Sequence, residues 1–519
     1  MPPVAGGDSP LTRASAPRAI RAPRMSDSDQ LPVFRVVGFT GHRQLKDAVG
    51  VQRLLGEVLT ELRTDAKVEW LALSSIAEGA DMLFARAALR LGLGWEVMLP
   101  MPQVEFRNDF TPEVWREVEG LLAYAEHARV IGERSQRDDA YLDCGMETVN
   151  HCDVLLAVWD GERSRGRGGT AEIIAYARDL GRPVIIIDAK TLAVRRENVA
   201  RMARGDKYLA ELNELPAVTL PAAAAAEDDS GRRTVLAFHH KVDGAATKHA
   251  PHFPKLITIT LAFHLLAAAL AAATLAFNLH GAALPWGKLF CLLAATGAAT
   301  LLVYRRQRLE WVRYRLAAEI TRSALATWGV PRALRLFDDF DWAGLEPLRR
   351  ALDVLGRRSA RAHRLNFDQF KQRYIRERID GQLAYFSRQQ AKAQPLFERL
   401  RLGFFACSSL AIFFAAAYAV HSLVPQAVPP PWVPAWVYGF GPIVLPVLAA
   451  GFLSLVSVND LHQRVARCRE MHVRLETART EATFVQTWGA LERVVAKAER
   501  ALLQEVFEWH SITSFSETQ

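Results

Sequence analysis

The stretch DVLLAVWDGERSRGRGGTAEIIAYARDLGRPVIIID, residues 153–188, contains two short apolar runs separated by a glycine-rich loop and a helical pattern. The apolar runs cover residues 154–159 and 184–187, and the helical periodicity begins after Gly169. When a helix connects two strands, the two strands usually lie parallel to each other in one sheet. The stretch therefore predicts one βαβ unit of a largely parallel sheet.

The same alternation extends back to residue 33. Expected strands are VFRVVGF at 33–39, EWLALSS at 69–75 and WEVMLP at 95–100, and expected helices are 51–63 and Ala80 to Leu91. This order predicts an α/β Rossmann-like domain over residues 33–190, with helices on both faces of the sheet. Ligands of such sheets bind at the carboxyl ends of the strands.

Four apolar runs of about 20 residues or more follow, at 256–279, 285–304, 402–422 and 432–457. Runs of this length predict an all-α membrane domain with four transmembrane helices, with buried helices of a soluble protein as the alternative. Arg305, Arg306 and Arg308 follow the second run, and Arg399 and Arg401 precede the third. Because positive flanks stay inside, we expect a multi-pass protein of the bacterial inner (plasma) membrane with both termini and cytosolic helical extensions on the inner side.

Seven segments follow from these patterns. They are an extension (1–32, with Met25 as an alternative start), the Rossmann-like domain (33–190), a linker and coupling helix (191–255), a transmembrane hairpin (256–304), cytosolic helices (305–401), a second hairpin (402–457) and C-terminal cytosolic helices (458–519).

The net charge and the cysteines limit the classes of partner. The formal charge of +8 comes largely from Arg beside the apolar runs, which favours a lipid bilayer over a nucleic acid as the partner. The five cysteines show no CxxC pair, so the sequence predicts neither a disulfide framework nor a metal site.

Three segments at expected strand ends carry candidate ligand-binding residues. Glycines there allow close approach of a phosphate, hydroxyls and backbone amides can bond it, and arginines can pair with it. The alternatives are a structural turn for the first segment, an N-cap role for Asp81 in the second, and a flexible loop for the third. The candidates are Gly38, Thr40, Gly41, His42 and Arg43; Ser74, Ser75, Glu78, Gly79 and Asp81; and Arg167, Gly168, Gly169, Thr170 and Glu172, the last beside Arg163 and Arg165.

Two of these segments carry a resemblance to a known superfamily. SSIAEGAD at 74–81 looks like the S-x-x-A-x-G-x-D element of DprA/Smf proteins, and GRGGTAE at 166–172 is similar to the P-G-G-x-G-T-x-x-E motif of LOG hydrolases. Residues 33–190 thus resemble the SLOG superfamily, which implies a nucleotide, NAD or ADP-ribose-like ligand. The chain lacks the Pro and spacer Gly of the LOG motif, and Glu172 follows Thr170 by two positions instead of three.

The membrane half resembles the SLATT class of bacterial membrane effectors. The similar stretches are RLEWVRYRLAAEI after the second run and RYIRERIDGQLAYFSRQQAKA before the third. This resemblance implies a homo-oligomeric, nucleotide-sensing membrane effector of stress or antiphage signalling, with a pore as one form of action. A membrane-tethered nucleotide N-glycosidase using Glu172 or Asp81 is the alternative, and a scaffold with a degenerate pocket is a third.

Overall fold

The computed structural model describes the chain from residue 29 to residue 515 with several internal gaps. The described residues are 29–65, 67–131, 137–164, 166–202, 207–221, 227–249, 253–279, 281, 283–304, 307–330, 343–362, 366–423 and 433–515. They divide into a sheet unit, Met1–Phe238 with Asp341–Arg364, and a helical unit, His239–Phe340 with Leu365–Gln519. Most of the predicted extension, residues 1–28, lies outside the described part.

The sheet unit is built on a seven-stranded sheet with the order β4-β3-β2-β1-β5-β6-β7. All neighbours are parallel except β7, which pairs antiparallel with β6. The strand order reverses between β1 and β5, which makes their carboxyl ends the topological switch point. The strands are β1 Val33–Gly41, β2 Val68–Ser74, β3 Gly94–Leu99, β4 His127–Val130, β5 Val154–Trp159, β6 Val184–Asp188 and β7 Val194–Glu197.

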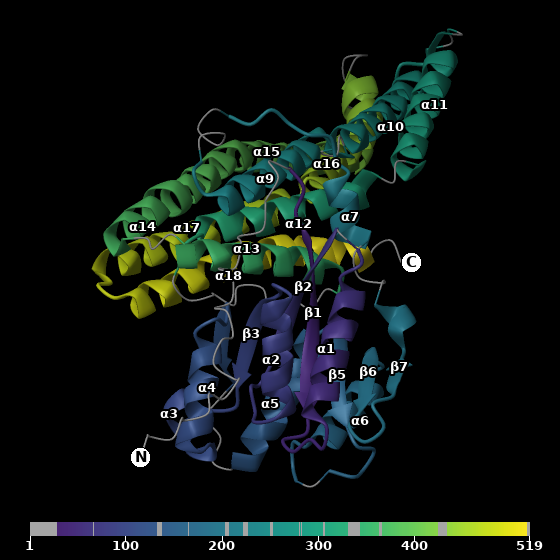
Figure 1. Ribbon diagram of the computed structural model, residues 1–519. Coiled ribbons are helices and arrows are strands. Elements are labelled where there is room, and N and C mark those ends of the chain that lie inside the picture. The colour runs from purple at the N-terminus through teal and green to yellow at the C-terminus, as the bar shows by residue number, and fades with distance from the viewer. Residues whose placement is uncertain are drawn as a thin grey trace, which may run out of the picture. The chain divides into compact units, whose positions relative to one another are not determined.

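Helices cover both faces of this sheet (Figure 1). The helices α1 and α2 pack on the face that carries Val37 and Phe39, whereas α5 packs beside Gly38 on the other face. The helical elements of the unit are α1 Ala48–Leu62, α2 Ala80–Arg90, α3 Gln103–Phe106, η1 Arg107–Asp109, α4 Pro112–Leu122, α5 Arg137–His151, α6 Thr170–Asp179, η2 Val199–Arg201, α7 Lys207–Asn213, the first part of α9 Ser230–Lys248, η3 Ala343–Leu345 and α13 Glu346–Ala362.

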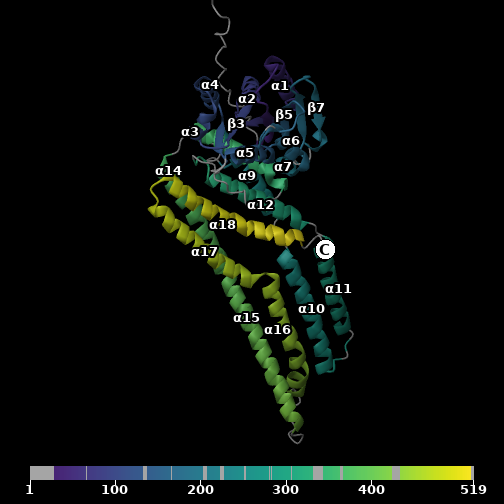
Figure 2. The same ribbon diagram turned by 90° about the horizontal axis from the view of Figure 1, so that it is seen from below.

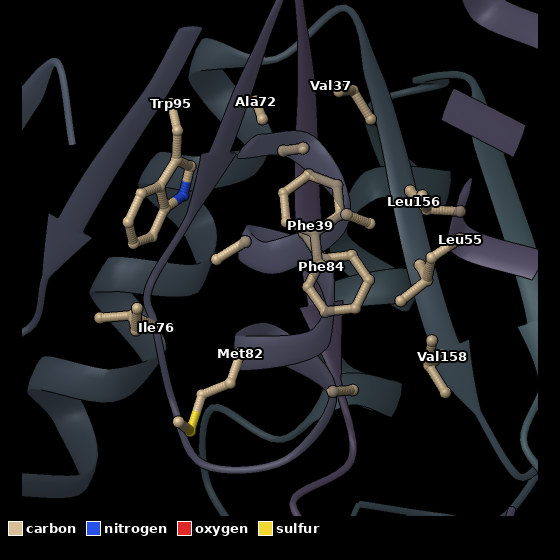
Figure 3. Close-up of a cluster of buried hydrophobic side chains, with 14 of the residues drawn as sticks. Val37, Phe39, Leu55, Ala72, Ile76, Met82, Phe84, Trp95, Leu156 and Val158 are labelled. Carbon is tan, nitrogen blue, oxygen red and sulfur yellow. The ribbon is translucent and has the colours of Figure 1, made fainter. Parts of the chain in front are cut away.

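The core of the sheet unit lies between the central strands and α1 and α2 (Figure 3). The rings of Phe39 and Phe84 stack with centroids 4.4 Å apart, and both side chains are buried. Trp95 from β3 is fully buried and donates its indole N–H to Ser74 Oγ at 3.1 Å. Alternation along β1 sends Phe39 into this core, and it sends position 38 to the opposite face.

The α/β prediction for this region is confirmed, although the strands β4 and β7 and the helices α3, α4 and α5 were not expected. The expected strands correspond to β1, β2, β3, β5 and β6, and the expected helix Ala80 to Leu91 corresponds to α2. The strand β4, with the sequence HARV, and the helix α5, with a polar sequence, carry little apolar periodicity. The antiparallel edge strand β7, VRRE, has none.

The helical unit contains four helices that are long and apolar enough to cross a membrane, as far as the described residues go. Two of them, α10 and α11, pack on each other, as do α15 and α16, and α16 also contacts α10 (Figure 2). The elements are the second part of α9, α10 Phe253–Ala276, α11 Ala283–Tyr304, α12 Gln307–Ala326, α14 Phe367–Arg373, η4 Tyr374–Ile379, α15 Asp380–Leu423, η5 Pro434–Phe440, α16 Gly441–Val458, α17 Leu461–Phe484 and α18 Trp488–Phe515.

The apolar runs continue into helices with charged surfaces. The helix α15 runs unbroken for 44 residues, so the expected boundary at residue 402 lies inside one helix. In contrast, α16 ends at Val458, and Asp460 takes a left-handed conformation with φ 47° before α17 begins. A second core joins η4, α15, α17 and α18 around Tyr374, Met471 and Val495.

The division of the chain differs from the predicted segments at two places. Residues 341–364 were expected to belong with the other helices of segment 305–401, but they are part of the sheet unit. The helix α13 contacts β1 there, and its apolar residues Leu348, Leu352 and Leu355 are buried. The sheet unit also extends past residue 190 to Phe238.

Candidate functional site

The loops after β1 and β5 meet at the carboxyl edge of the sheet. His42 follows β1, and its backbone N–H donates to Val158 O of β5 at 3.3 Å. The backbone N–H of Asp160, after β5, donates to His42 Nε2 at 3.1 Å. These two bonds join the loops on either side of the switch point, where ligands of open parallel sheets bind.

Asp160 is the acidic partner of this histidine. Its Oδ1 lies 3.0 Å from His42 Nε2, so this nitrogen donates to the carboxylate when it carries a proton and accepts the Asp160 N–H when it does not. Burial opposes the charge of Asp160, but the backbone N–H of Glu162 and the His42 ring outweigh burial and hold the pKa of that carboxyl below its ordinary value. Sequence reasoning missed Asp160 as a site residue, although an acid directly after a buried strand was a usable signal.

The loop after β2 is fastened to the loop after β1. The backbone N–H of Ala80 donates to His42 O at 3.1 Å. Gly79 has φ +90°, and a Cβ at that position would lie 2.1 Å from Arg43 O. The glycine is therefore required for the close approach of the two loops.

Ile76, in the same loop, has φ +56°. A β-branched residue is strained in this conformation, at a cost of about 1–3 kcal/mol. Its side chain is fully buried, which holds the strained backbone in place. Backbone strain of this kind is concentrated at functional sites, so Ile76 supports the assignment of the loop.

Asp81 organises the loop from inside. It is 2% exposed and accepts the Ser75 hydroxyl at 3.1 Å as well as the backbone N–H of Ala77. Burial raises the pKa of Asp81 to about 7, against these hydrogen bonds and the charge of Arg43. Asp81 thus supports the loop backbone, and the N-cap position itself belongs to Gly79.

The stability of the protein is expected to fall between pH 5 and pH 8 relative to an Asp81→Asn variant. The folded pKa is about 7 against an ordinary 3.8, so the stabilising contribution is complete below about pH 3.8 and is lost as pH rises through 7. The loss between pH 5 and 8 is about 2–3 kcal/mol. Thermal unfolding of both detergent-solubilised proteins across this range measures it, and parallel pH curves would contradict it.

The loop before α6 differs from the predicted phosphate cradle in one respect. The backbone N–H of Gly168 donates to Glu172 Oε2 at 2.8 Å. Glu172 thereby caps the start of its own helix, as a carboxylate in a first helical turn commonly does. Gly168 has φ +75° and lies against the backbone of Tyr141 and Leu142, and Thr170 is buried.

The arginines near this loop are placed unequally. Arg167 Nη1 pairs with Asp139 Oδ1 at 2.8 Å, and Arg163 is exposed. Arg165 lies outside the described residues. Arg43 is exposed, and its guanidinium carbon lies 5.4 Å from the centroid of the Tyr141 ring.

Tyr141 brings α5 to the edge of the site. Its hydroxyl donates to Asp109 Oδ2, and Arg137 Nη2 pairs with Asp109 Oδ1 at 2.6 Å. Burial and the bond to Asp109 raise the pKa of Tyr141. Sequence reasoning missed these three residues because no spacing connects residue 109 with a helix that begins near residue 137.

Two predicted site residues have structural roles instead. Gly38 is in the middle of β1, and a Cβ there would lie 2.8 Å from Cys152 Cβ, so this glycine allows α5 to pack and does not form a turn. Ser74 is fully buried and accepts the indole N–H of Trp95. Both residues lie inside strands, where pleating directs the side-chain position into the layers of helices.

The remaining predicted residues lie near the edge. Thr40 and Gly41 are the last two residues of β1, and a Cβ at Gly41 would lie 2.5 Å from Ala80 Cβ. Glu78 is exposed on the loop after β2. Gly169 is the N-cap of α6. Within the described part of the chain, no group of three or more His, Cys, Asp or Glu could hold a metal ion.

Comparison with known proteins adds no family to this geometry. No protein-family model matches the sequence, and no curated protein matches it. The site is therefore interpreted from its own residues.

Proposed function

We propose that the sheet unit binds a nucleotide-derived ligand, such as NAD or ADP-ribose, at the carboxyl edge between β1 and β5. The observation that carries this proposal is the pair of bonds by which His42 joins the loops of both strands at the switch point. Arg43 is exposed beside this junction, and a guanidinium forms bidentate bonds to phosphate oxygens. Tyr141, beneath Arg43, offers an aromatic face.

Binding without hydrolysis is the better supported role. A general acid or base has to reach the scissile bond. Glu172 bonds the Gly168 N–H, and Asp81 is buried and bonds Ser75. Both carboxylates thus maintain loop structure, so we favour a ligand sensor over a membrane-tethered N-glycosidase.

The helical unit supplies the second half of the proposal. Its four apolar helices are long and apolar enough to cross a membrane, and we propose a bacterial inner membrane with both termini inside, as the positive flanks favour. Ligand binding changes the state of these helices when the ligand binds two conformations with different affinity. A homo-oligomeric, SLATT-like effector that permeabilises the membrane in stress or antiphage signalling is the form we propose.

The test uses the full chain in lipid nanodiscs. Calorimetric titration with NAD, ADP-ribose and cyclic AMP is expected to show binding of at least one ligand, weakened about ten-fold or more by Arg43→Ala because one charged hydrogen-bonding group is lost. Arg53→Ala is the matched control, since Arg53 is an exposed arginine paired with Glu57 on α1. Binding of none of the ligands, or equal affinity of all three proteins, would refute the sensor.

A dye-release measurement on proteoliposomes tests the effector half. The ligand found by calorimetry should release trapped dye from vesicles carrying the wild-type chain or Arg53→Ala, and it should release less from vesicles carrying Arg43→Ala. Ligand binding without dye release would support the sensor but refute membrane permeabilisation as its action. Release of ribose 5-phosphate or nicotinamide would instead favour the enzyme.

A further inference from the structure

The helix α13 carries arginines along one face. The face begins at Arg350. Val354 follows four positions later, and Arg357, Arg358 and Arg361 follow seven, eight and eleven positions later. Residues at these spacings share one side of an α-helix. Val354 is 1% exposed, so this side of the helix is covered.

The groups that cover it are at the amino ends of five neighbouring strands. Arg350 pairs with Asp153, just before β5, and bonds Phe34 O at the start of β1. Arg358 reaches Glu69 of β2 at 2.6 Å and Glu126, just before β4, at 3.0 Å. The helix thus crosses the edge of the sheet opposite to the candidate ligand site.

The two remaining arginines complete the row. Arg357 pairs with Glu96 of β3, and Arg361 donates to Ala125 O at 2.9 Å. These partners lie along the same edge of the sheet, because Glu96 is near the start of β3 and Ala125 comes just before β4. Arg350 and Arg358 are 13% and 18% exposed, so these pairs are better shielded from water and salt than ordinary surface pairs.

In the chain, α13 lies between the two apolar hairpins. The chain forms α10 and α11 before residue 341, and it forms α15 and α16 after residue 364. Both pairs belong to the helical unit, whereas α13 belongs to the sheet unit. The sheet unit therefore holds the chain a second time, between the two apolar hairpins, in addition to the linker around residues 191–255.

We propose that α13 is a tie through which the sheet unit acts on both hairpins: four arginines hold it to the strands, and along the chain it lies between the hairpin of α10 and α11 and that of α15 and α16. A displacement of the strand ends moves α13, and α13 moves the chain on either side. The docking of α13 on the strands does not depend on the proposed ligand. Only the transmission of ligand binding through α13 to the hairpins rests on the proposed function. The tie adds a second connection to the linker and coupling helix predicted at residues 191–255.

Cleavage of the linker in the full-length protein tests the tie. Residues 222–226 are replaced by a protease site, the protein carries a C-terminal affinity tag, and the detergent-solubilised protein is cut and captured. The tie predicts that the untagged N-terminal fragment stays on the resin. Arg350→Glu combined with Arg358→Glu should lower its retention at least ten-fold, and Arg53→Glu on α1 should leave retention unchanged.

A charge exchange separates docking from misfolding. Arg357→Glu alone and Glu96→Arg alone should each lower retention, and the two substitutions together should restore it, because they recreate the pair with reversed charges. Release of the wild-type fragment after cleavage, or full retention of the Arg350 and Arg358 double variant, would overturn the proposal. Neither result concerns the ligand, so failure of the tie and failure of the sensor are distinguishable.

Discussion

Replacing Arg378 by alanine is expected to destabilise the helical unit by about 3–5 kcal/mol, the usual cost of removing one member of a buried ion pair. Arg378 is 5% exposed and lies between two buried carboxylates. It bonds Glu499 of α18 at 2.6 and 2.9 Å and Glu319 of α12 at 3.2 Å. The single guanidinium thus joins η4 to two other helices.

The cost arises from what the substitution leaves behind. Burial disfavours the charge of Glu319, but Arg378, together with Arg322 and Arg315, keeps the pKa of Glu319 below its ordinary value. Glu499 is fully buried and also accepts the Tyr374 hydroxyl at 2.9 Å. Without Arg378, two buried carboxylates lose their shared cation, and one or both must take up a proton or recruit water.

Hydrogen exchange of peptides from α12 and α18 in the detergent-solubilised protein measures this loss. Arg376→Ala is the matched control, because Arg376 lies in the same π-helical turn and is 76% exposed. That control should change local stability by less than about 0.5 kcal/mol. Equal exchange rates in the two variants would show that the buried cluster contributes nothing measurable.

Replacing Gly79 by alanine is expected to disrupt the candidate site and to cost about 2–4 kcal/mol. The backbone at Gly79 has φ +90° and ψ −118°, which a residue with a Cβ avoids. The added carbon would also clash with the backbone carbonyl of Arg43. A backbone group cannot avoid the clash by changing a side-chain rotamer. The loop carrying His42 and Arg43 must therefore move, and affinity for any ligand held there should fall with it.

Gly92→Ala separates the clash from the backbone conformation. Gly92 has φ +70°, and a Cβ there would meet no atom within 4 Å, so only the conformational cost of about 1 kcal/mol remains. Thermal unfolding and the calorimetric titration of both variants compare the two positions. If Gly79→Ala behaves like Gly92→Ala in both measurements, the close approach of the two loops is not required.

The fold of the sheet unit could be predicted where a strand is mostly apolar. The central strands β1, β2 and β5 and the helix α2 have strong periodicity, and the structure has them where the sequence predicts. The strands β4 and β7 are short edge elements with charged residues, so their pairing depends on neighbours that the local sequence does not show.

The site could be predicted only as a set of loops. Gly79 and Gly38 both carry the local signature of a turn glycine, but Gly38 lies inside β1, where the packing of a helix requires it. The role of Glu172 as a cap depends on a side-chain direction, and the pairing of His42 with Asp160 joins residues 118 positions apart. The docking of α13 on the sheet likewise depends on partners far away in the sequence.

The order of synthesis gives the split sheet unit a further consequence. Residues 1–238 leave the ribosome before the hairpin of α10 and α11, and α13 follows that hairpin. The interval from residue 238 to 364 is 126 residues, or roughly 6–25 s at ordinary elongation rates. During this time Glu69, Glu96, Glu126 and Asp153 lack their arginines, so the nascent domain presents an open acidic edge until α13 has been made, after the first hairpin.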